Sequence, residues 1–175
     1  MLQTFSATAP WPPDLDDAVS FATTWHGDQR RPAGEPYVEH LREATAFLAY
    51  GAEVTDREIL TAAVLHDVVE DTDCTLTTVR TTFGDRVATL VDWVTKSDDR
   101  AAYLTRLRSA PLDALLVKLA DRASNVQRLN THPRQEKQRS YYAETVRSIV
   151  PLADAHPWFR DWYATWQQEF AHLSA

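Results

Sequence analysis

The chain has 175 residues and a formal net charge of −7, and its length predicts a single domain over residues 1–175. The acidic balance argues against a protein that binds a nucleic acid polymer or an anionic membrane surface, because both need a broad basic face. A single cysteine, Cys74, excludes an internal disulfide and fits a reducing cytoplasm, which we expect as the location. Met1–Trp11 lacks the features of a signal peptide, and no apolar run reaches the length of a membrane span.

The predicted elements are almost all helical, because glycine is scarce and apolar residues recur three and four positions apart. In chain order, the ranges expected to be helical are 14–25, 37–50, 55–70, 76–83, 85–95, 97–109, 111–130, 133–155 and 157–175. Pro151 is expected to kink or break the range 133–155. The sequence therefore predicts an all-α bundle of about eight to ten helices, with its motifs in about 15–130 and C-terminal helices in about 133–174.

Local signals predict the ends and one face of these helices. Thr55 and Glu58 have the spacing of a capping box, and Asp85 is expected to cap the helix that follows Gly84. Aromatic residues repeat every four positions along the last range, at Trp158, Trp162, Trp166 and Phe170. We expect this stripe to pack on the bundle or at a subunit contact rather than to stack nucleobases.

A polar cluster follows the apolar segment 59–65. His66, Asp67, Glu70 and Asp71 are spaced so that they share one face of a helix. Three carboxylates there repel one another, and acidic groups are unfavourable at the negative end of a helix dipole. A divalent metal would compensate them, whereas a solvated acidic turn is the simpler structural alternative. This cluster alone leaves both interpretations open.

A second polar group is found in and after a strongly apolar range, 115–120, which Lys118 interrupts. Asp121 follows that range and Asn125 lies four residues later, which places both on one helix face. An aspartate in a buried helix needs a partner. His40 adds an imidazole in the first turn of the range 37–50.

His40, the His66-Asp67 pair and Asp121 together resemble the HD superfamily of metal-dependent phosphohydrolases. Four further stretches are similar, in the same order, to the hydrolase domains of RelA/SpoT proteins: 26–31, 34–40, 62–72 and 117–122. The short chain is similar to the small alarmone hydrolases of the metazoan SpoT-homologue type. This resemblance implies an all-α HD-domain fold.

The resemblance also implies a metal site and a reaction. His40, His66, Asp67 and Asp121 would bind one Mn²⁺, although these ligand types also accommodate zinc or iron(II). Glu70 and Asp71 match the catalytic pair that positions or deprotonates the attacking water. The implied reaction is hydrolysis of the 3′-pyrophosphate of ppGpp or pppGpp, which gives GDP or GTP and pyrophosphate.

A polyanionic substrate needs fixed cations, and arginine can hold a phosphate with two hydrogen bonds or stack on a purine. The residues expected to bind the substrate are Arg30, Arg31, Tyr37, Lys96, Asn125 and Arg128. Arg100, Lys118 and Arg122 are further candidates. Two positions depart from the family pattern, because Pro32 stands where a lysine is frequent and Leu41 where a proline is frequent.

Two alternatives remain open at this stage. The segment between Thr95 and Pro111 is shorter than in the metazoan relatives, which favours a phosphohydrolase that acts on another nucleotide, such as NADPH or a nucleoside phosphate. A non-catalytic module that binds nucleotides is the second alternative. The sequence also leaves a homodimer open.

Overall fold

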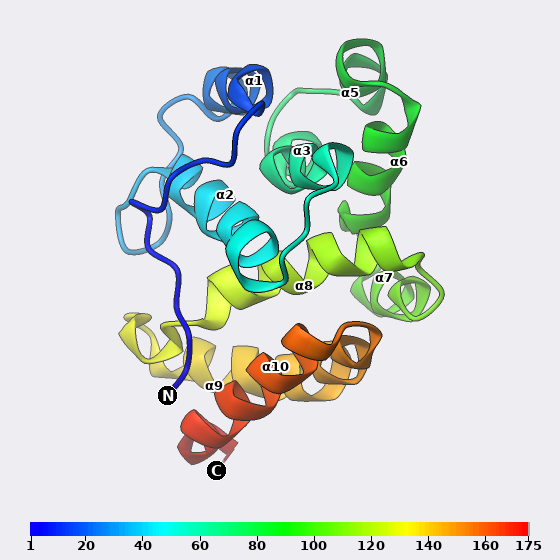
Figure 1. The fold of residues 1–175 in the computed structure, drawn as a ribbon. Coiled ribbons are helices and arrows are strands. Elements are labelled where there is room, and N and C mark those ends of the chain that lie inside the picture. The colour runs from blue at the N-terminus through cyan, green and yellow to red at the C-terminus, as the bar shows by residue number, and fades with distance from the viewer. Residues whose placement is uncertain (175) are drawn as a thin grey trace.

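The computed structural model describes residues 1–174, which form an all-α fold (Figure 1). The α-helices are α1 (Asp16–His26), α2 (Tyr37–Ala46), α3 (Arg57–Leu65), α4 (Val68–Asp71), α5 (Leu76–Phe83), α6 (Asp85–Val94), α7 (Arg100–Leu107), α8 (Leu112–Val126), α9 (Gln135–Glu144) and α10 (Pro157–Glu169). Shorter π or 3₁₀ segments are η1 (Phe47–Gly51), η2 (Leu129–Thr131), η3 (Thr145–Ile149), η4 (Val150–Ala155) and η5 (Ala171–Ser174). These elements confirm the predicted all-α class.

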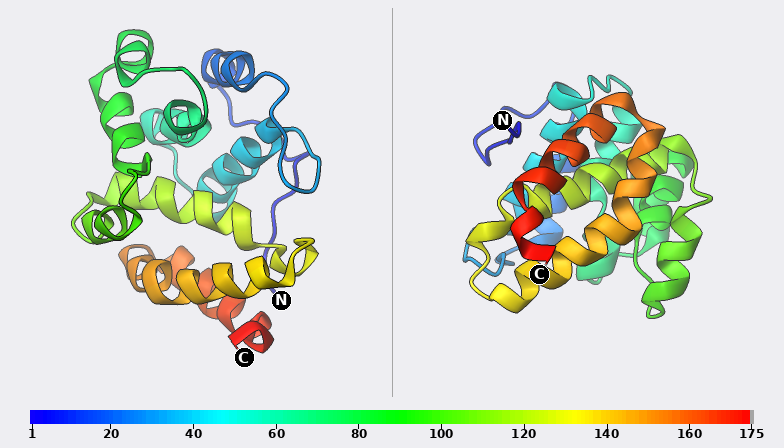
Figure 2. Two further views of the ribbon diagram at one scale, coloured as in Figure 1. Left: turned by 180° about the vertical axis from the view of Figure 1, so that it is seen from behind. Right: turned by 90° about the horizontal axis from the view of Figure 1, so that it is seen from below.

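Helix α8 crosses the middle of the molecule, with α2, α3 and α6 on one side and α9 and α10 on the other (Figures 1 and 2). Twelve of its fifteen residues are buried. A helix that is surrounded on all sides must be apolar nearly all round, and the run from Ala114 to Ala120 provides this. Because α8 is central, a polar side chain on it faces either another helix or a cavity.

The aromatic helix α10 is attached to the core through α8. Tyr163 donates to the Leu119 carbonyl at 2.7 Å, and Trp166 donates to the Val126 carbonyl at 2.9 Å. Trp162 donates to the carbonyl of Gln3 at 2.7 Å, so the N-terminal segment lies against the C-terminal helix. The prediction that the aromatic stripe packs on the bundle is therefore confirmed.

Three predicted helix boundaries are wrong. The cap of α3 is Asp56 rather than Thr55, because the Asp56 side chain accepts from the amides of Glu58 and Ile59. Asp85 is the first helical residue of α6, and Gly84, with φ of 93°, stands in the capping position. In the range 133–155 the α-helix already ends at Glu144, where π and then 3₁₀ segments replace it.

The range 55–70 is also not one helix, since α3 ends at Leu65 and α4 begins at Val68. The His66 ring explains the interruption. Its Nδ1 lies 2.7 Å from the Ala63 carbonyl oxygen, which in a continuous α-helix accepts the amide of Asp67. The side chain thus competes with the helix backbone, and the turn that results directs His66 and Asp67 into the interior.

Candidate metal centre and active-site cavity

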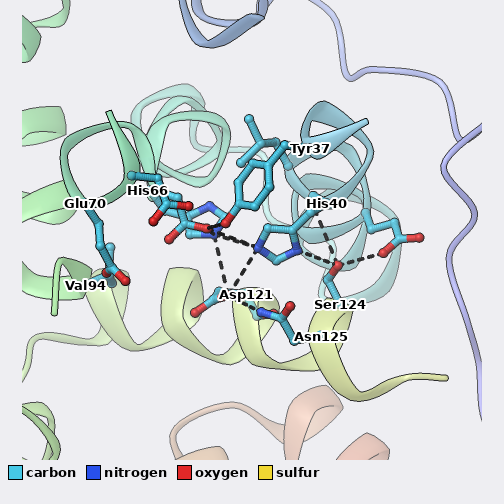
Figure 3. Close-up of polar contacts among 12 residues, drawn as sticks. Tyr37, His40, His66, Glu70, Val94, Asp121, Ser124 and Asn125 are labelled. Carbon is cyan, nitrogen blue, oxygen red and sulfur yellow. Dashed lines mark hydrogen bonds and ion pairs between the residues drawn. The ribbon is translucent and has the colours of Figure 1, made fainter. Parts of the chain in front are cut away.

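Four buried side chains from three parts of the chain converge on one point (Figure 3). His40 comes from the first turn of α2, His66 and Asp67 from the junction of α3 and α4, and Asp121 from the middle of α8. One ligand atom from each residue lies within 4.8 Å of the others. Metal ligands predicted from separate motifs are therefore brought together by the fold.

The spacing of these atoms fits a single ion. The two Nε2 atoms of His40 and His66 are 3.0 Å apart. Asp67 Oδ2 lies 3.3 Å from His40 Nε2 and 3.0 Å from His66 Nε2. Asp121 Oδ1 lies 3.4 Å and 3.6 Å from the same two nitrogens. Donors bound to one ion at about 2.1 Å lie about 3–4 Å apart.

The hydrogen bond of His66 Nδ1 determines which nitrogen faces the cluster. A backbone carbonyl only accepts hydrogen bonds, so Nδ1 of His66 carries the proton that it donates to Ala63. In the neutral ring, Nε2 is then left with its lone pair directed at the cluster, as a metal ligand requires. The donor set and this tautomer both fit a divalent ion.

The two carboxylates of the cluster are ionised in spite of their burial. Burial raises the pKa of Asp67, but His66 and His40 outweigh it and hold that pKa well below its usual value. Lys118 has the same effect on the pKa of Asp121, to which its Nζ donates at 2.7 Å. Burial lowers the pKa of His66, whereas the two carboxylates raise it to about 10. The two ionised carboxylates therefore favour a cation at this point. Without metal that cation is the proton on His66, and a bound divalent ion would replace it, because a ligating Nε2 must be deprotonated.

Tyr37 orients one of these carboxylates. Its hydroxyl donates to Asp67 Oδ2 at 2.6 Å (Figure 3). Burial and the charge of Asp67 raise the pKa of Tyr37 far above its usual range, so the phenol stays protonated as a donor. Asn125 acts similarly on α8, because its side-chain amide donates to Asp121 Oδ1 at 2.8 Å.

A cavity of about 410 Å³ adjoins the metal cluster. Asp67 and Asp121 lie in its wall together with Glu70 and Asp71. Its basic lining residues are Arg31, Lys96, Arg100, Lys118, Arg122, Arg128 and His132. A larger hollow, of about 640 Å³, lies between α1, α3 and α5 and contains none of the predicted site residues. The smaller cavity is the one equipped for a polyanion.

The predicted catalytic pair is held by hydrogen bonds. Glu70 accepts from both the amide and the Nζ of Lys96, at 3.0 Å and 2.6 Å. Burial lowers the pKa of Lys96, but nearby Asp121, Asp67 and Glu70 outweigh it and raise that pKa above its usual value. Asp71 accepts from the side-chain amide of Gln29 at 3.0 Å. Both carboxylates are thus fixed at the rim of the cluster.

Arg30 is the one predicted substrate-binding residue that does not line the cavity. Its guanidinium donates to the Gly34 carbonyl at 2.9 Å within the loop between α1 and α2. Arg30 also pairs through its backbone with Pro36, which tightens the loop. The neighbouring Arg31 does line the cavity. The other five predicted substrate-binding residues also line it, namely Arg31, Tyr37, Lys96, Asn125 and Arg128.

Three polar residues beside the site were not predicted from the sequence. Glu43 on α2 and Ser124 on α8 are fully buried next to His40. Glu144 pairs with both Arg100 and Arg122, the first at 2.7 Å and 2.6 Å and the second at 2.6 Å. Glu43 stands within the largely apolar range 41–48. A carboxylate in a buried helix needs a partner, so Glu43 could have been identified from the sequence as Asp121 was.

Comparison with known proteins assigns the family. The HD domain model matches residues 18–157. The chain belongs to the HD domain family, whose all-α fold it has.

Named relatives and a solved structure narrow the similarity. The human guanosine-3′,5′-bis(diphosphate) 3′-pyrophosphohydrolase MESH1 is 43% identical over 126 residues, which cover 66% of this chain and 69% of that protein. A protein of Aquifex aeolicus with the same enzyme name is 37% identical over 150 residues, 80% of this chain but only 21% of the relative's length. A solved metazoan orthologue of SpoT, described as hydrolysing ppGpp, superposes with a TM-score of 0.82 at 28% identity, covering 92% of this chain and 98% of its own.

None of the helices within residues 1–174 combines the length and apolar character needed to cross a bilayer.

Proposed function

We propose that the protein is a Mn²⁺-dependent hydrolase that removes the 3′-pyrophosphate of ppGpp or pppGpp. The observation that carries this proposal is the position of the metal cluster in the wall of a cavity that also presents two further carboxylates and several cations. The names of the human and Aquifex relatives support the choice of substrate. The ligand set of two imidazoles and two carboxylates, without a thiolate, suits Mn²⁺.

Each part of the site has a role in this reaction. His40, His66, Asp67 and Asp121 would hold the ion, which supplies Lewis-acid polarisation of a phosphoryl oxygen and a more acidic attacking water. Glu70 and Asp71 orient that water and take its proton as its oxygen bonds to the 3′-phosphorus. The bond between this phosphorus and the sugar 3′-oxygen breaks, the oxygen gains a proton, and pyrophosphate leaves.

The basic residues of the cavity bind the substrate. Lys96 pairs with Glu70 and places a positive charge near the reacting phosphate. Arg31 and Arg128 lie on the wall formed by the loop before α2 and the end of α8. Arg100 and Arg122 add cations beside Tyr141. Fixed charges of this kind stabilise the charge that develops on transferring phosphoryl groups.

Two variants separate metal binding from catalysis. Asp67→Ala should abolish both Mn²⁺ binding and pyrophosphate release from ppGpp. Glu70→Gln should still bind Mn²⁺ but lose about 10²–10⁴-fold in kcat, the usual contribution of a general base. Asp154→Asn is the matched control, because Asp154 is exposed and does not line the cavity. Full activity of Glu70→Gln would contradict the assigned role.

The alternative substrates rest on the sequence-based expectation that the segment between Thr95 and Pro111, which contains α7, is shorter than in the metazoan relatives. A panel of ppGpp, pppGpp, NADPH and nucleoside phosphates at equal concentration compares kcat/KM directly. A strong preference for a nucleotide without a 3′-pyrophosphate would replace the proposed function. Tight binding of nucleotide with no product in any divalent metal would favour the non-catalytic module.

We also propose that residues 1–175 act as one HD-type domain that works on a small nucleotide in the cytoplasm. One continuous set of buried residues from Leu2 to Leu173 supports the single unit. A single cooperative unfolding transition would agree with it. Light scattering of the purified chain tests the homodimer that the sequence leaves open.

A further inference from the structure

Glu43 is a buried carboxylate beside the metal cluster that the proposed mechanism does not use. It lies on α2, one turn after His40, and none of its surface is exposed. A charge buried in this way needs compensating partners. Its three side-chain partners are Arg31, Arg128 and Ser124.

Two arginines pair with the two carboxylate oxygens of Glu43. Arg31 donates to Oε2 at 3.0 Å, and Arg128 donates to Oε1. Their side chains are 16% and 43% exposed, so both reach from the cavity wall down to the buried carboxylate. An ionised carboxylate accepts hydrogen bonds and cannot donate them.

The hydroxyl of Ser124 links this carboxylate to the metal ligand His40. Ser124 Oγ lies 2.7 Å from Glu43 Oε2 and 2.9 Å from His40 Nδ1 (Figure 3). A serine hydroxyl has one proton. Because Glu43 can only accept, that proton is donated to Glu43, and the serine oxygen is left to accept from His40. The His40 carbonyl, at 3.5 Å, is too far away to compete.

The direction of these two hydrogen bonds fixes the tautomer of His40. Nδ1 carries the ring proton, and Nε2 presents its lone pair to the metal cluster. Ser124 and Glu43 thus do for His40 what the Ala63 carbonyl does for His66. Partners of this kind orient a ligating histidine and increase its basicity.

We propose that Glu43 is a positioning residue of the metal centre, which acts on His40 through Ser124 and is itself held by Arg31 and Arg128. This inference rests on the divalent ion of the proposed function, but not on the identity of the nucleotide. Two of the cavity's cations are consequently engaged by a carboxylate, so this wall offers one net positive charge to a substrate rather than two.

The test is the affinity of the metal-free protein for Mn²⁺, measured by titration calorimetry without nucleotide. Ser124→Ala and Glu43→Ala should each weaken Mn²⁺ binding about 10–100-fold, the usual effect of removing such a partner, while Ser124→Thr should recover most of the affinity. Because both residues act along one chain of hydrogen bonds, the double variant should bind no more weakly than the weaker single variant. Glu39→Ala, a partly exposed glutamate on the same helix, should bind as the wild type does.

Ser124→Ala decides the question if Glu43→Ala does not fold, because it removes one oxygen atom and leaves Glu43 with both arginines. Wild-type Mn²⁺ affinity in Ser124→Ala, or additive losses in the double variant, would overturn the proposal. Failure to bind Mn²⁺ in the wild type would overturn it as well. If the wild type binds Mn²⁺ but leaves ppGpp intact, only the proposed function fails.

Discussion

At the scale of single residues, the site is defined by ion pairs and not only by the metal ligands. Lys118 is fully buried and donates to Asp121 at 2.7 Å. Lys96 pairs with Glu70. The sequence identifies both lysines as candidates for phosphate contacts. Asp121 lies three residues after Lys118 on the same helix face, so the spacing already allows that pair. Glu70 lies on a different element from Lys96, so this second pair is visible only in the fold.

Removal of the Lys118 charge should destabilise the metal-free protein, because Asp121 loses its ion-pair partner. Lys118→Met is expected to lower the free energy of unfolding of the metal-free protein by about 3 kcal/mol, because it leaves a buried carboxylate without its ion-pair partner. Mn²⁺ should restore part of the loss by replacing that charge. Urea unfolding with EDTA and with Mn²⁺ measures both effects. An equal loss in the exposed control Lys137→Met would contradict this explanation.

Glu144 predicts a dependence of stability on pH. Burial raises its pKa, but Arg100 and Arg122 outweigh burial and lower the pKa from 4.5 to about 2. A group whose pKa falls on folding stabilises the protein above its unfolded pKa, so this contribution is lost as pH falls from 4.5 to 2. After allowance for partial exposure it is about 1–2 kcal/mol.

Unfolding at pH 6 and at pH 3 measures the contribution of Glu144. Glu144→Gln should have a lower free energy of unfolding than the wild type at pH 6, and this difference should be smaller at pH 3. An equal difference at both pH values would show that the ion pairs with Arg100 and Arg122 do not contribute.

At the scale of elements, the junction between α3 and α4 places two of the candidate metal ligands in the interior. The apolar period predicts one helix over 55–70, whereas α3 ends at Leu65 and α4 begins at Val68. The interruption itself depends on whether the His66 ring turns back to the Ala63 carbonyl. The orientation of the His66 ring depends on His40 from α2 and Asp121 from α8, which complete the cluster, so it was not predictable from the local sequence.

At the start of α3, two substitutions distinguish the predicted cap, Thr55, from the observed cap, Asp56. Asp56→Ala should lower the free energy of unfolding by about 1–2 kcal/mol, because Asp56 caps the helix and also pairs with Arg86. Thr55→Ala should change it by less than about 0.5 kcal/mol, the usual range for an exposed residue. Thermal or urea unfolding compares them, and the reverse order would restore the predicted capping box.

At the scale of the whole molecule, motifs spread over about 80 residues, from His40 to Asp121, meet because α8 is central. The all-α class and the four metal ligands were predicted from composition and from the resemblance. The position of Arg30 outside the cavity wall was not predicted, because it depends on the conformation of the loop between α1 and α2. Glu43 was recognisable as a carboxylate within a largely apolar range, but its contact with Ser124, across 81 residues, was not predictable from the sequence.

Gly51 in η1 and Trp158 in α10 lie so close together that substitutions there test the packing of these two elements. A Cβ added at Gly51 would lie 2.5 Å from Cη2 of Trp158. Gly51→Ala should therefore lower the free energy of unfolding by about 1–3 kcal/mol through overpacking. Trp158→Leu in the same chain should recover part of that loss, and a double-mutant cycle measures the coupling. Purely additive effects would contradict a direct contact.

Product analysis of ppGpp incubated with the purified protein and Mn²⁺ is the direct test of the proposed reaction. Hydrolysis of the 3′-pyrophosphate gives equal amounts of GDP and pyrophosphate, and no reaction is expected when EDTA replaces the metal. Release of orthophosphate, or intact ppGpp in the presence of protein-bound Mn²⁺, would contradict it.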